Sequence, residues 1–372
     1  MAFPQDTSGS NILYGTPRNP YNSNYYPGGS SSGSAYAVSV GLVPITLGSD
    51  GGGSIRIPAS FCSVYGLKTT HGRLSCHPGQ NHSNTNGVNG PIAANIESLT
   101  ALYEVISEPH PSTYFAATSL GSGKFSVNPS RPKVIGIPEA WFAQSAPGVQ
   151  RLCRDMIDRL AEKKGYKVVS IDMPYVDEGQ MAHALTILTD AATLLPEPRG
   201  LSPGNRVLLA LGRTTPATDF MLAQKLRRVL MQHLAWLWQT YPGMVIVTPT
   251  SSCAGWPIRT SSELVHGVSD GDTTIKTMKY VWLANFLGAP SITVPAGYVK
   301  PEGAVGEGDV VTDLDAPGKV PVGLMATGEW ASEHALLQFG LDAEAMGDDK
   351  VCRPPNWVDV VELAKQAKAH NA

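Results

Sequence analysis

The feature that most constrains the fold of this chain is a strand–helix–strand pattern near its middle. Residues 133–137 form an apolar run that predicts a strand, and residues 167–171 form the next one. Between them, four apolar residues at helical spacing predict an amphipathic helix that ends at Gly165: Val149, Leu152, Met156 and Leu160. Two strands joined by a helix usually pair in parallel with a right-handed crossover, so we expect a layered α/β fold.

The same alternation extends over most of the chain. Further strands are predicted over residues 42–48, 244–248, 290–295 and 320–326. Further helices are predicted over residues 34–41, 55–61, 91–106, 176–195, 218–240, 275–287 and 333–341. Residues 72–90 and 107–131 are predicted to be loops, and residues 300–318 an acidic, glycine-rich surface excursion. Since no internal repeat is visible, we expect one domain over residues 1–372.

The composition excludes several classes of protein. Charged residues make up only 16% of the 372 residues, against about 25% in a typical soluble chain, and hydrophobic residues make up 42%. This balance excludes intrinsic disorder and a coiled coil. The net charge is −3 without a basic patch, so we expect no nucleic-acid partner. No apolar run reaches the roughly 20 residues of a membrane span, so we expect no membrane partner.

The cysteines and the first residues of the chain indicate the cellular compartment. The five cysteines contain no CxxC pair, which indicates reduced, structural thiols. Residues 1–6 have neither a positive start nor an apolar stretch, so they do not read as a signal peptide. We therefore expect a cytoplasmic protein.

Two glycine- and serine-rich turns carry the chemistry. Residues 28–34 read GGSSSGS, and residues 51–54 read GGGS. Glycine runs let a backbone pass close to a ligand, and consecutive N–H groups can bind an anion. A hydroxyl beside such a cradle is what acyl transfer requires, because the hydroxyl attacks while the N–H groups hold the oxyanion.

Phosphate binding is the competing interpretation of these turns. The Walker pattern needs a lysine after the glycines, and none follows either turn. The GxGxxG fingerprint and the GxSxG elbow are also absent. The residues alone therefore favour acyl transfer only modestly.

Residues 14–73 nevertheless resemble the signature segment of the amidase signature family. The matching stretches read PGGSSSGSA at 27–35, LGSDGGGSIRIPASFC at 47–62 and GLKTTHGR at 66–73. Weaker similarities continue at residues 89–93, 248–250, 285–290 and 321–324, so the resemblance covers nearly the whole chain. Its details look most like fungal amidases. The resemblance implies a layered α/β/α fold with a mixed, largely parallel central sheet flanked by helices, incomplete at its N-terminus.

The family resemblance also implies roles for particular residues. Its members hydrolyse amides with a Ser–cis-Ser–Lys triad, which makes Ser54 the nucleophile and Ser30 the proton relay, with a cis bond between Gly29 and Ser30. The backbone N–H groups of residues 51–54 would form the oxyanion hole. By the same resemblance, three residues would hold the two loops in place: Ser31, Asp50 and Arg56.

The lysine of the triad is missing from the sequence. No lysine occurs before Lys68, and residues 1–9 look like the continuation of the family's lysine segment, which would then lie just before Met1. The gene product is then either longer than this chain or a true short product without the base. Because a lone serine hydroxyl is a weak nucleophile, we expect this chain to show little amidase activity. We also expect it to be unstable or to expose apolar surface.

Three functions remain open. The first is an amide hydrolase acting on a small-molecule amide, with no cofactor and no metal, since the nine histidines are scattered without metal-ligand spacing. The second is a catalytically inactive pseudoenzyme or binding protein. The third, the A component of a glutamyl-tRNA amidotransferase, is disfavoured because that component usually has Gln where Ile57 stands, and because residues 82–89 differ from its sequence. The identity of the amide and the oligomeric state are not predicted.

Overall fold

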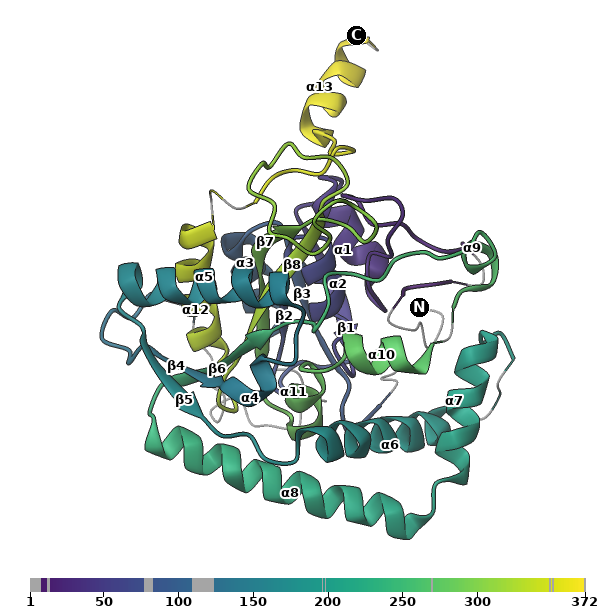
Figure 1. Cartoon of the computed structure of the whole chain (residues 1–372), viewed down its shortest axis with the longest axis vertical. Helices are drawn as coiled ribbons and strands as arrows, with labels where there is room; N and C mark the ends of the chain where they lie inside the picture. The colour runs from purple at the N-terminus through teal and green to yellow at the C-terminus, as the bar shows by residue number, and fades with distance from the viewer. Residues whose placement is uncertain are drawn as a thin grey trace.

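One mixed sheet of eight strands forms the centre of the fold (Figure 1). The computed structural model describes residues 8–11, 14–76, 83–108, 124–195, 197, 199–268, 270–347, 349 and 351–370. The strands are β1 (Ile45–Asp50), β2 (Tyr65–Lys68), β3 (Val88–Ala93), β4 (Val134–Pro138), β5 (Lys167–Ile171), β6 (Met244–Pro249), β7 (Ser291–Val299) and β8 (Val320–Thr327). Their order across the sheet is β1-β3-β2-β7-β8-β6-β4-β5. That all these strands share one sheet supports the proposal of a single domain.

The strand directions confirm a mixed sheet but not a largely parallel one. Only β4 runs parallel to its neighbours, β5 and β6, whereas all other neighbouring pairs are antiparallel. The prediction of largely parallel pairing is therefore wrong. The parallel strands β4 and β5 are joined by helical residues within 139–164, whereas the consecutive strands β7 and β8 are joined by residues 300–319. A connection without a crossover helix favours antiparallel pairing.

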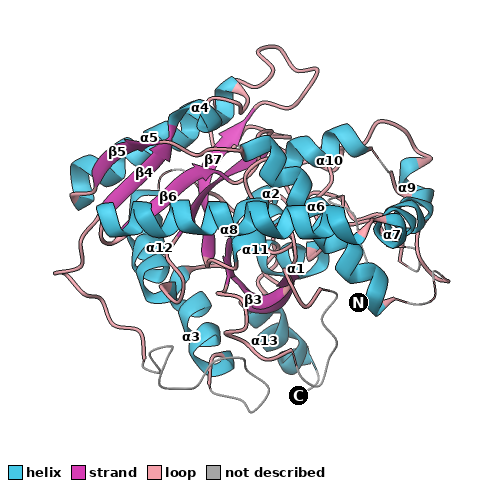
Figure 2. Ribbon diagram, turned by 90° about the horizontal axis from the view of Figure 1, so that it is seen from below, coloured by secondary structure: helices cyan, strands magenta, loops and turns pink. Residues whose placement is uncertain are grey.

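Helices cover both faces of the sheet, giving three layers (Figure 2). On one face, α3 (Ile96–Ile106), α5 (Pro147–Lys164) and α12 (Glu333–Gly347) contribute to the larger apolar core. On the other face, α2 (Arg56–Phe61), α6 (Val176–Leu194), α8 (Ala217–Thr240) and α11 (Trp282–Leu287) contribute to a second core. The remaining helices are α1 (Ser32–Ser39), α4 (Glu139–Phe142), α7 (Pro203–Thr214), α9 (Glu263–His266), α10 (Gly271–Thr277) and α13 (Val360–His370).

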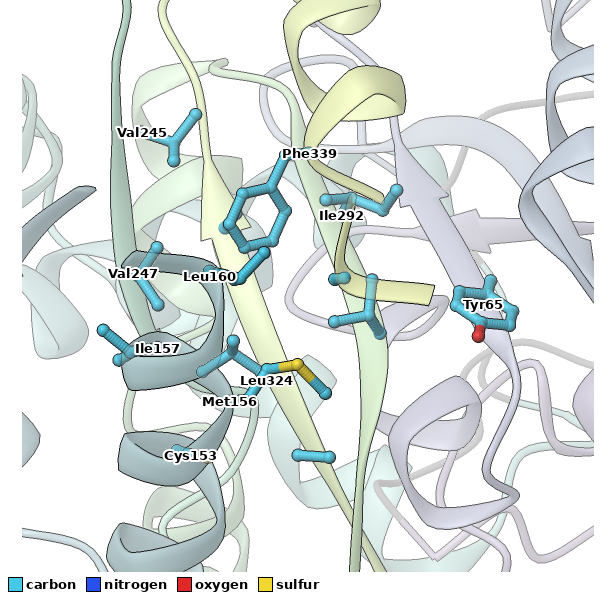
Figure 3. Close-up of a cluster of buried hydrophobic side chains, with 14 of the residues drawn as sticks. Tyr65, Cys153, Met156, Ile157, Leu160, Val245, Val247, Ile292, Leu324 and Phe339 are labelled. Atoms are coloured by element: carbon cyan, nitrogen blue, oxygen red, sulfur yellow. The ribbon is translucent and has the colours of Figure 1, made fainter. Parts of the chain in front are cut away.

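The apolar sequence of strand β6 fits a position between two layers of helices. Val245 and Val247 face the larger core (Figure 3), whereas Met244 and Ile246 belong to the second one. Because successive side chains of a strand point to opposite faces, a continuous apolar run can bury both faces at once.

The strand–helix–strand unit at residues 133–171 is confirmed. Helix α5 begins at Pro147 and ends before Gly165, whose φ of 74° lies in the left-handed region. Strand β5 pairs in parallel with β4 from Lys167 to Ile171. Proline at the start and glycine after the end are the common boundaries of a helix.

Two of the predicted helices are partly wrong. Residues 91–93 belong to β3, where Pro91 pairs with Leu47 of β1, and α3 begins only after Asn95, whose side chain accepts a hydrogen bond from Ser98 N at 2.7 Å. The predicted helix over 275–287 is interrupted at residues 278–281, between α10 and α11. That interruption packs Met278 and Val281 against the glycine run described below.

Helix α7 was not predicted from the sequence. The Ser202 side chain caps α7, and Pro203 occupies its first turn. Helices α7 and α8 expose several large apolar side chains: Val207, Leu211, Met221, Leu222 and Trp236. Residues 300–318 contain no helix or strand, and most of their side chains are exposed. Among the described helices, none is both long and apolar enough to cross a bilayer.

Candidate active site

Ser31 joins the two glycine- and serine-rich turns. Its backbone N–H donates to Ser54 O at 3.1 Å. Its hydroxyl donates to Ser49 O at 3.3 Å and accepts from Ser49 N at 3.2 Å. These three contacts hold the turn before α1 against the end of β1 and the glycine run. The structure thus brings together the two segments that carry the predicted serines.

The two predicted reacting serines both lie half-buried beside this junction. Ser30 follows the Gly29–Ser30 bond, which is cis as predicted, and precedes α1. Ser54 ends the glycine run, two residues before α2. Because each hydroxyl belongs to a turn and not to the middle of an element, both can face a ligand that the backbone closely approaches.

The glycine run from Gly51 to Gly53 is packed so closely that a side chain there would force neighbouring side chains to shift. A Cβ at Gly52 would lie 2.7 Å from the Met278 side chain, and one at Gly53 would lie 2.5 Å from Val281. Gly53 also has a φ of +110°, which residues with a side chain rarely adopt. The run is therefore fixed between α6 and residues 278–281, which is the rigidity that a preorganised oxyanion hole needs.

One of the four predicted oxyanion donors has a hydrogen-bond partner within the turn. The Gly53 N–H donates to Asp50 Oδ1 at 2.7 Å, so it is engaged inside the turn. The N–H groups of Gly51, Gly52 and Ser54 are left as candidate donors. Gly53 contributes its backbone conformation instead.

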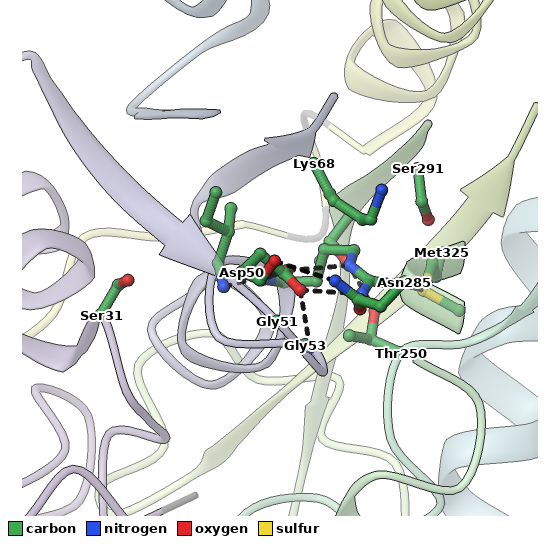
Figure 4. Close-up of polar contacts among 12 residues, drawn as sticks. Ser31, Asp50, Gly51, Gly53, Lys68, Thr250, Asn285, Ser291 and Met325 are labelled. Carbon is green, nitrogen blue, oxygen red and sulfur yellow. Dashed lines mark hydrogen bonds and ion pairs between the residues drawn. The ribbon is translucent and has the colours of Figure 1, made fainter. Parts of the chain in front are cut away.

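Asp50 and Arg56 form a fully buried ion pair next to the glycine run. Figure 4 shows Asp50 beside Gly51 and Gly53 of that run. The guanidinium Nε and Nη2 donate to the two carboxylate oxygens at 3.0 and 3.1 Å. The same carboxylate accepts backbone N–H groups from Gly53 and Ile55. Burial alone would raise the pKa of Asp50, but the Arg56 charge and hydrogen bonds, the Lys68 charge and the Gly53 N–H hold the pKa of Asp50 well below its usual range. Asp50 is therefore an anion that organises the turn.

Asn285 connects this ion pair to other parts of the fold and was not predicted as a site residue. Its Oδ1 accepts from Arg56 Nη2 at 2.5 Å, and its Nδ2 donates to Asp50 O and Asn86 O at 2.9 and 3.1 Å. The side chain is fully buried on α11. The signal that could have found it is its place in the NFLGAP segment at residues 285–290.

Lys68 is buried nearby and has a structural role. Its Nζ donates to Thr69 O at 2.8 Å and to Ala289 O at 2.7 Å. Burial and the neighbouring Arg56 charge lower the pKa of Lys68 to about 7. Because its Nζ donates to both carbonyl groups, Lys68 joins the end of β2 to the residues just before β7.

The described cysteines are all free thiols, and Cys62 is buried, which fits a small apolar side chain. Burial raises the pKa of the Cys62 thiol, which disfavours a reactive thiolate. Within the described part of the chain, no group of three or more potential metal ligands is found.

The fold and the sequence both match known amidases. A family profile described as amidase matches residues 2–337, and the chain belongs to this family. The sequence is 33% identical to a fatty acid amide hydrolase of Medicago truncatula over 96% of this chain. It is 27% identical to the A component of the glutamyl-tRNA(Gln) amidotransferase of Deinococcus radiodurans over 93% of this chain. The match covers 58% of the first protein and 73% of the second, so the chain spans little more than half the length of the plant relative.

Solved structures show the same fold. A 6-aminohexanoate cyclic dimer hydrolase superposes with a TM-score of 0.77 at 21% identity, over 95% of this chain and 75% of that one. The A component of the glutamyl-tRNA(Gln) amidotransferase of Thermotoga maritima superposes with a TM-score of 0.72 at 25% identity, over 92% and 72%. These relatives do not support the specifically fungal resemblance, whereas the family itself is confirmed.

Proposed function

We propose that this protein hydrolyses carboxylic amides with Ser54 as nucleophile and Ser30 as proton relay. The observation that carries the proposal is the Ser31–Ser54 contact, which fixes the Ser30 turn against the glycine run that ends in Ser54. Ser54 Oγ would attack the amide carbonyl carbon while its proton passes to Ser30. The resulting tetrahedral oxyanion would collapse, breaking the C–N bond, and the leaving amine would take up a proton. Water would then hydrolyse the acyl-enzyme to the acid.

The oxyanion would be held by backbone N–H groups, for which Gly51, Gly52 and Ser54 are the proposed donors. Elsewhere, the loss of one such donor lowers the rate by about 10²–10³-fold. Asp50 and Arg56 would contribute by holding the turn of residues 51–54 in place, and they would not touch the substrate.

As the family resemblance implies, the proposed base for Ser30 is a lysine. Lys68 does not serve, because its ammonium is bound to Thr69 O and Ala289 O.

The test of the proposed nucleophile is covalent labelling. A fluorophosphonate is expected to modify Ser54, and digestion with mass spectrometry locates the adduct, because such probes react with an activated serine next to an oxyanion hole. Ser34→Ala is the matched control, since Ser34 lies one turn into α1 and its hydroxyl only donates to Leu47 O at 3.0 Å. An adduct on another serine, or none at all even with a small primary amine added as base, would contradict the proposal and favour a binding protein.

The proposed base leads to a second prediction. Small primary amines such as ethylamine are expected to accelerate both labelling and amide hydrolysis by residues 1–372, because an exogenous amine can take the proton that Ser30 relays. Rates are measured against amine concentration at an alkaline pH, where a substantial share of the amine is unprotonated. The Ser54→Ala variant must show no acceleration, since otherwise the amine attacks the substrate directly. A rate that does not depend on amine would argue against a lysine-type base.

Fatty acyl amides are the first substrates to test, because the plant relatives are named fatty acid amide hydrolases. The proposed substrate is a small molecule, and the proposed location is cytoplasmic, which the free cysteines support.

A further inference from the structure

His183 on α6 contacts the glycine run directly. Its Nε2 lies 2.9 Å from Gly51 O, and its Cε1 would lie 2.9 Å from a Cβ at Gly52. The imidazole is fully buried and packs edge-on against Phe286 of α11, with 6.2 Å between ring centroids. The ring therefore has one orientation, with one edge on the glycine run.

The protonation state of His183 follows from its surroundings. Burial lowers the pKa of His183 to about 4, so the ring is neutral at neutral pH and carries one N–H. A carbonyl oxygen can only accept a hydrogen bond, so this N–H is at Nε2. Among the described residues, Nδ1 then has no hydrogen-bond partner, and it remains an unprotonated acceptor.

The contact fixes the direction of the next peptide group. In a trans peptide, the C=O of Gly51 and the N–H of Gly52 point in opposite directions. A Gly51 carbonyl that accepts from α6 therefore turns the Gly52 N–H away from α6. Gly52 has no side chain of its own to resist rotation, so the hydrogen bond from His183 adds to the restraint that the packing of the run provides.

We propose that His183 is a positioning residue that orients the Gly52 N–H as an oxyanion donor. This role rests on the proposed function, and it concerns the transition state and not the binding of the substrate. The neutral ring donates to the Gly51 carbonyl, and the Gly52 N–H then points at the developing oxyanion on the carbonyl attacked by Ser54. Loss of the donor at residue 183 would weaken the restraint on this peptide, while the ground-state complex would keep its other contacts.

The variants that test this role are His183→Leu, which removes the donor, and His183→Gln, which keeps an N–H at a similar reach. Thr186→Val is the matched control: Thr186 is buried on the same helix and accepts from Gln224 Nε2 at 3.0 Å, without contact to the glycine run. Fluorophosphonate labelling of Ser54, with ethylamine present, gives the maximal rate and the inhibition constant separately. Urea unfolding reports the stability of each variant.

The maximal labelling rate is expected to fall by about 10²-fold in His183→Leu, with an inhibition constant within about twofold of the parent. His183→Gln is expected to recover most of the rate, and Thr186→Val to label like the parent even where its urea midpoint is lower. Equal rates in Leu and Gln variants, or a fall in Thr186→Val that matches His183→Leu, would overturn the positioning role.

Nitrogen-15 NMR of the parent imidazole separates this proposal from the proposed function. A neutral ring protonated at Nε2 is expected, and protonation at Nδ1 would overturn the assignment of His183 alone. A parent that does not label at Ser54 would instead contradict the proposed function, and the positioning role of His183 with it.

Discussion

Ser54→Ala is expected to lower amide hydrolysis by a factor on the order of 10⁴ or more, and adding Ser30→Ala is expected to lower it no further. The reason is that the two hydroxyls act as one unit. Ser54 supplies the electrons for the new C–O bond, and Ser30 removes the proton that this attack releases. Once the nucleophile is gone, the relay has nothing to deprotonate, so the second substitution adds no cost.

The measurement is kcat/KM for a fatty acyl amide, with ethylamine present, in the parent, both single variants and the double variant. Ser34→Ala serves again as the control and is expected to stay within a few-fold of the parent. Multiplication of the two single effects in the double variant would show independent roles, and the proposed relay would then be wrong.

The local parts of the fold could be predicted because their signals lie within a few residues. Helix α5 has its proline, its apolar spacing and its closing glycine within residues 147–165, and β5 follows directly. Helix α7 had comparable signals in Ser202 and Pro203, although it was not predicted.

The pairing of the strands could not be predicted in the same way. Strand β3 reads VNGPIA, and its proline and glycine argue against a central strand. Its place between β1 and β2 depends on partners elsewhere in the chain, such as Leu47 opposite Pro91. The antiparallel pairing of β1, β3 and β2 therefore could not be predicted from the sequence, and only the structure shows it.

In the candidate site too, the residues with a local sequence signal were predicted and those without one were not. The glycine runs and their serines were predicted, because that chemistry needs adjacent residues. His183 lies 132 residues after its partner Gly51, and Asn285 lies 235 residues after its partner Asp50. No local motif therefore identifies them. A weaker signal did exist for α6, where His183, Thr186 and Asp190 form a buried polar row at helical spacing.

Arg56→Met is expected to lower the free energy of unfolding by about 3–5 kcal/mol, because it leaves the buried Asp50 carboxylate without its counter-charge. Both side chains are fully buried, and the guanidinium also donates to Asn285. The control is Arg151→Met, which breaks an exposed ion pair with Asp309 and is expected to cost about 0–1 kcal/mol. Urea midpoints and slopes for the three proteins give the comparison.

The pH dependence separates this electrostatic cause from a simple loss of packing. In the parent, the pKa of Asp50 is held below its usual range, so the pair stabilises the fold above about pH 4, the ordinary value for aspartate, and this stabilisation is lost as pH falls further. Without Arg56, burial raises the pKa of Asp50, and protonation relieves the uncompensated charge at a higher pH. The difference between parent and Arg56→Met should therefore be largest near neutral pH and shrink as the pH falls toward the ordinary aspartate value. The Arg56 guanidinium also contacts Met325 Sδ at 3.3 Å. A difference that stays constant over this range would assign the loss to the contacts of Arg56 with Met325 and Asn285, and the role of the ion pair would have to be withdrawn.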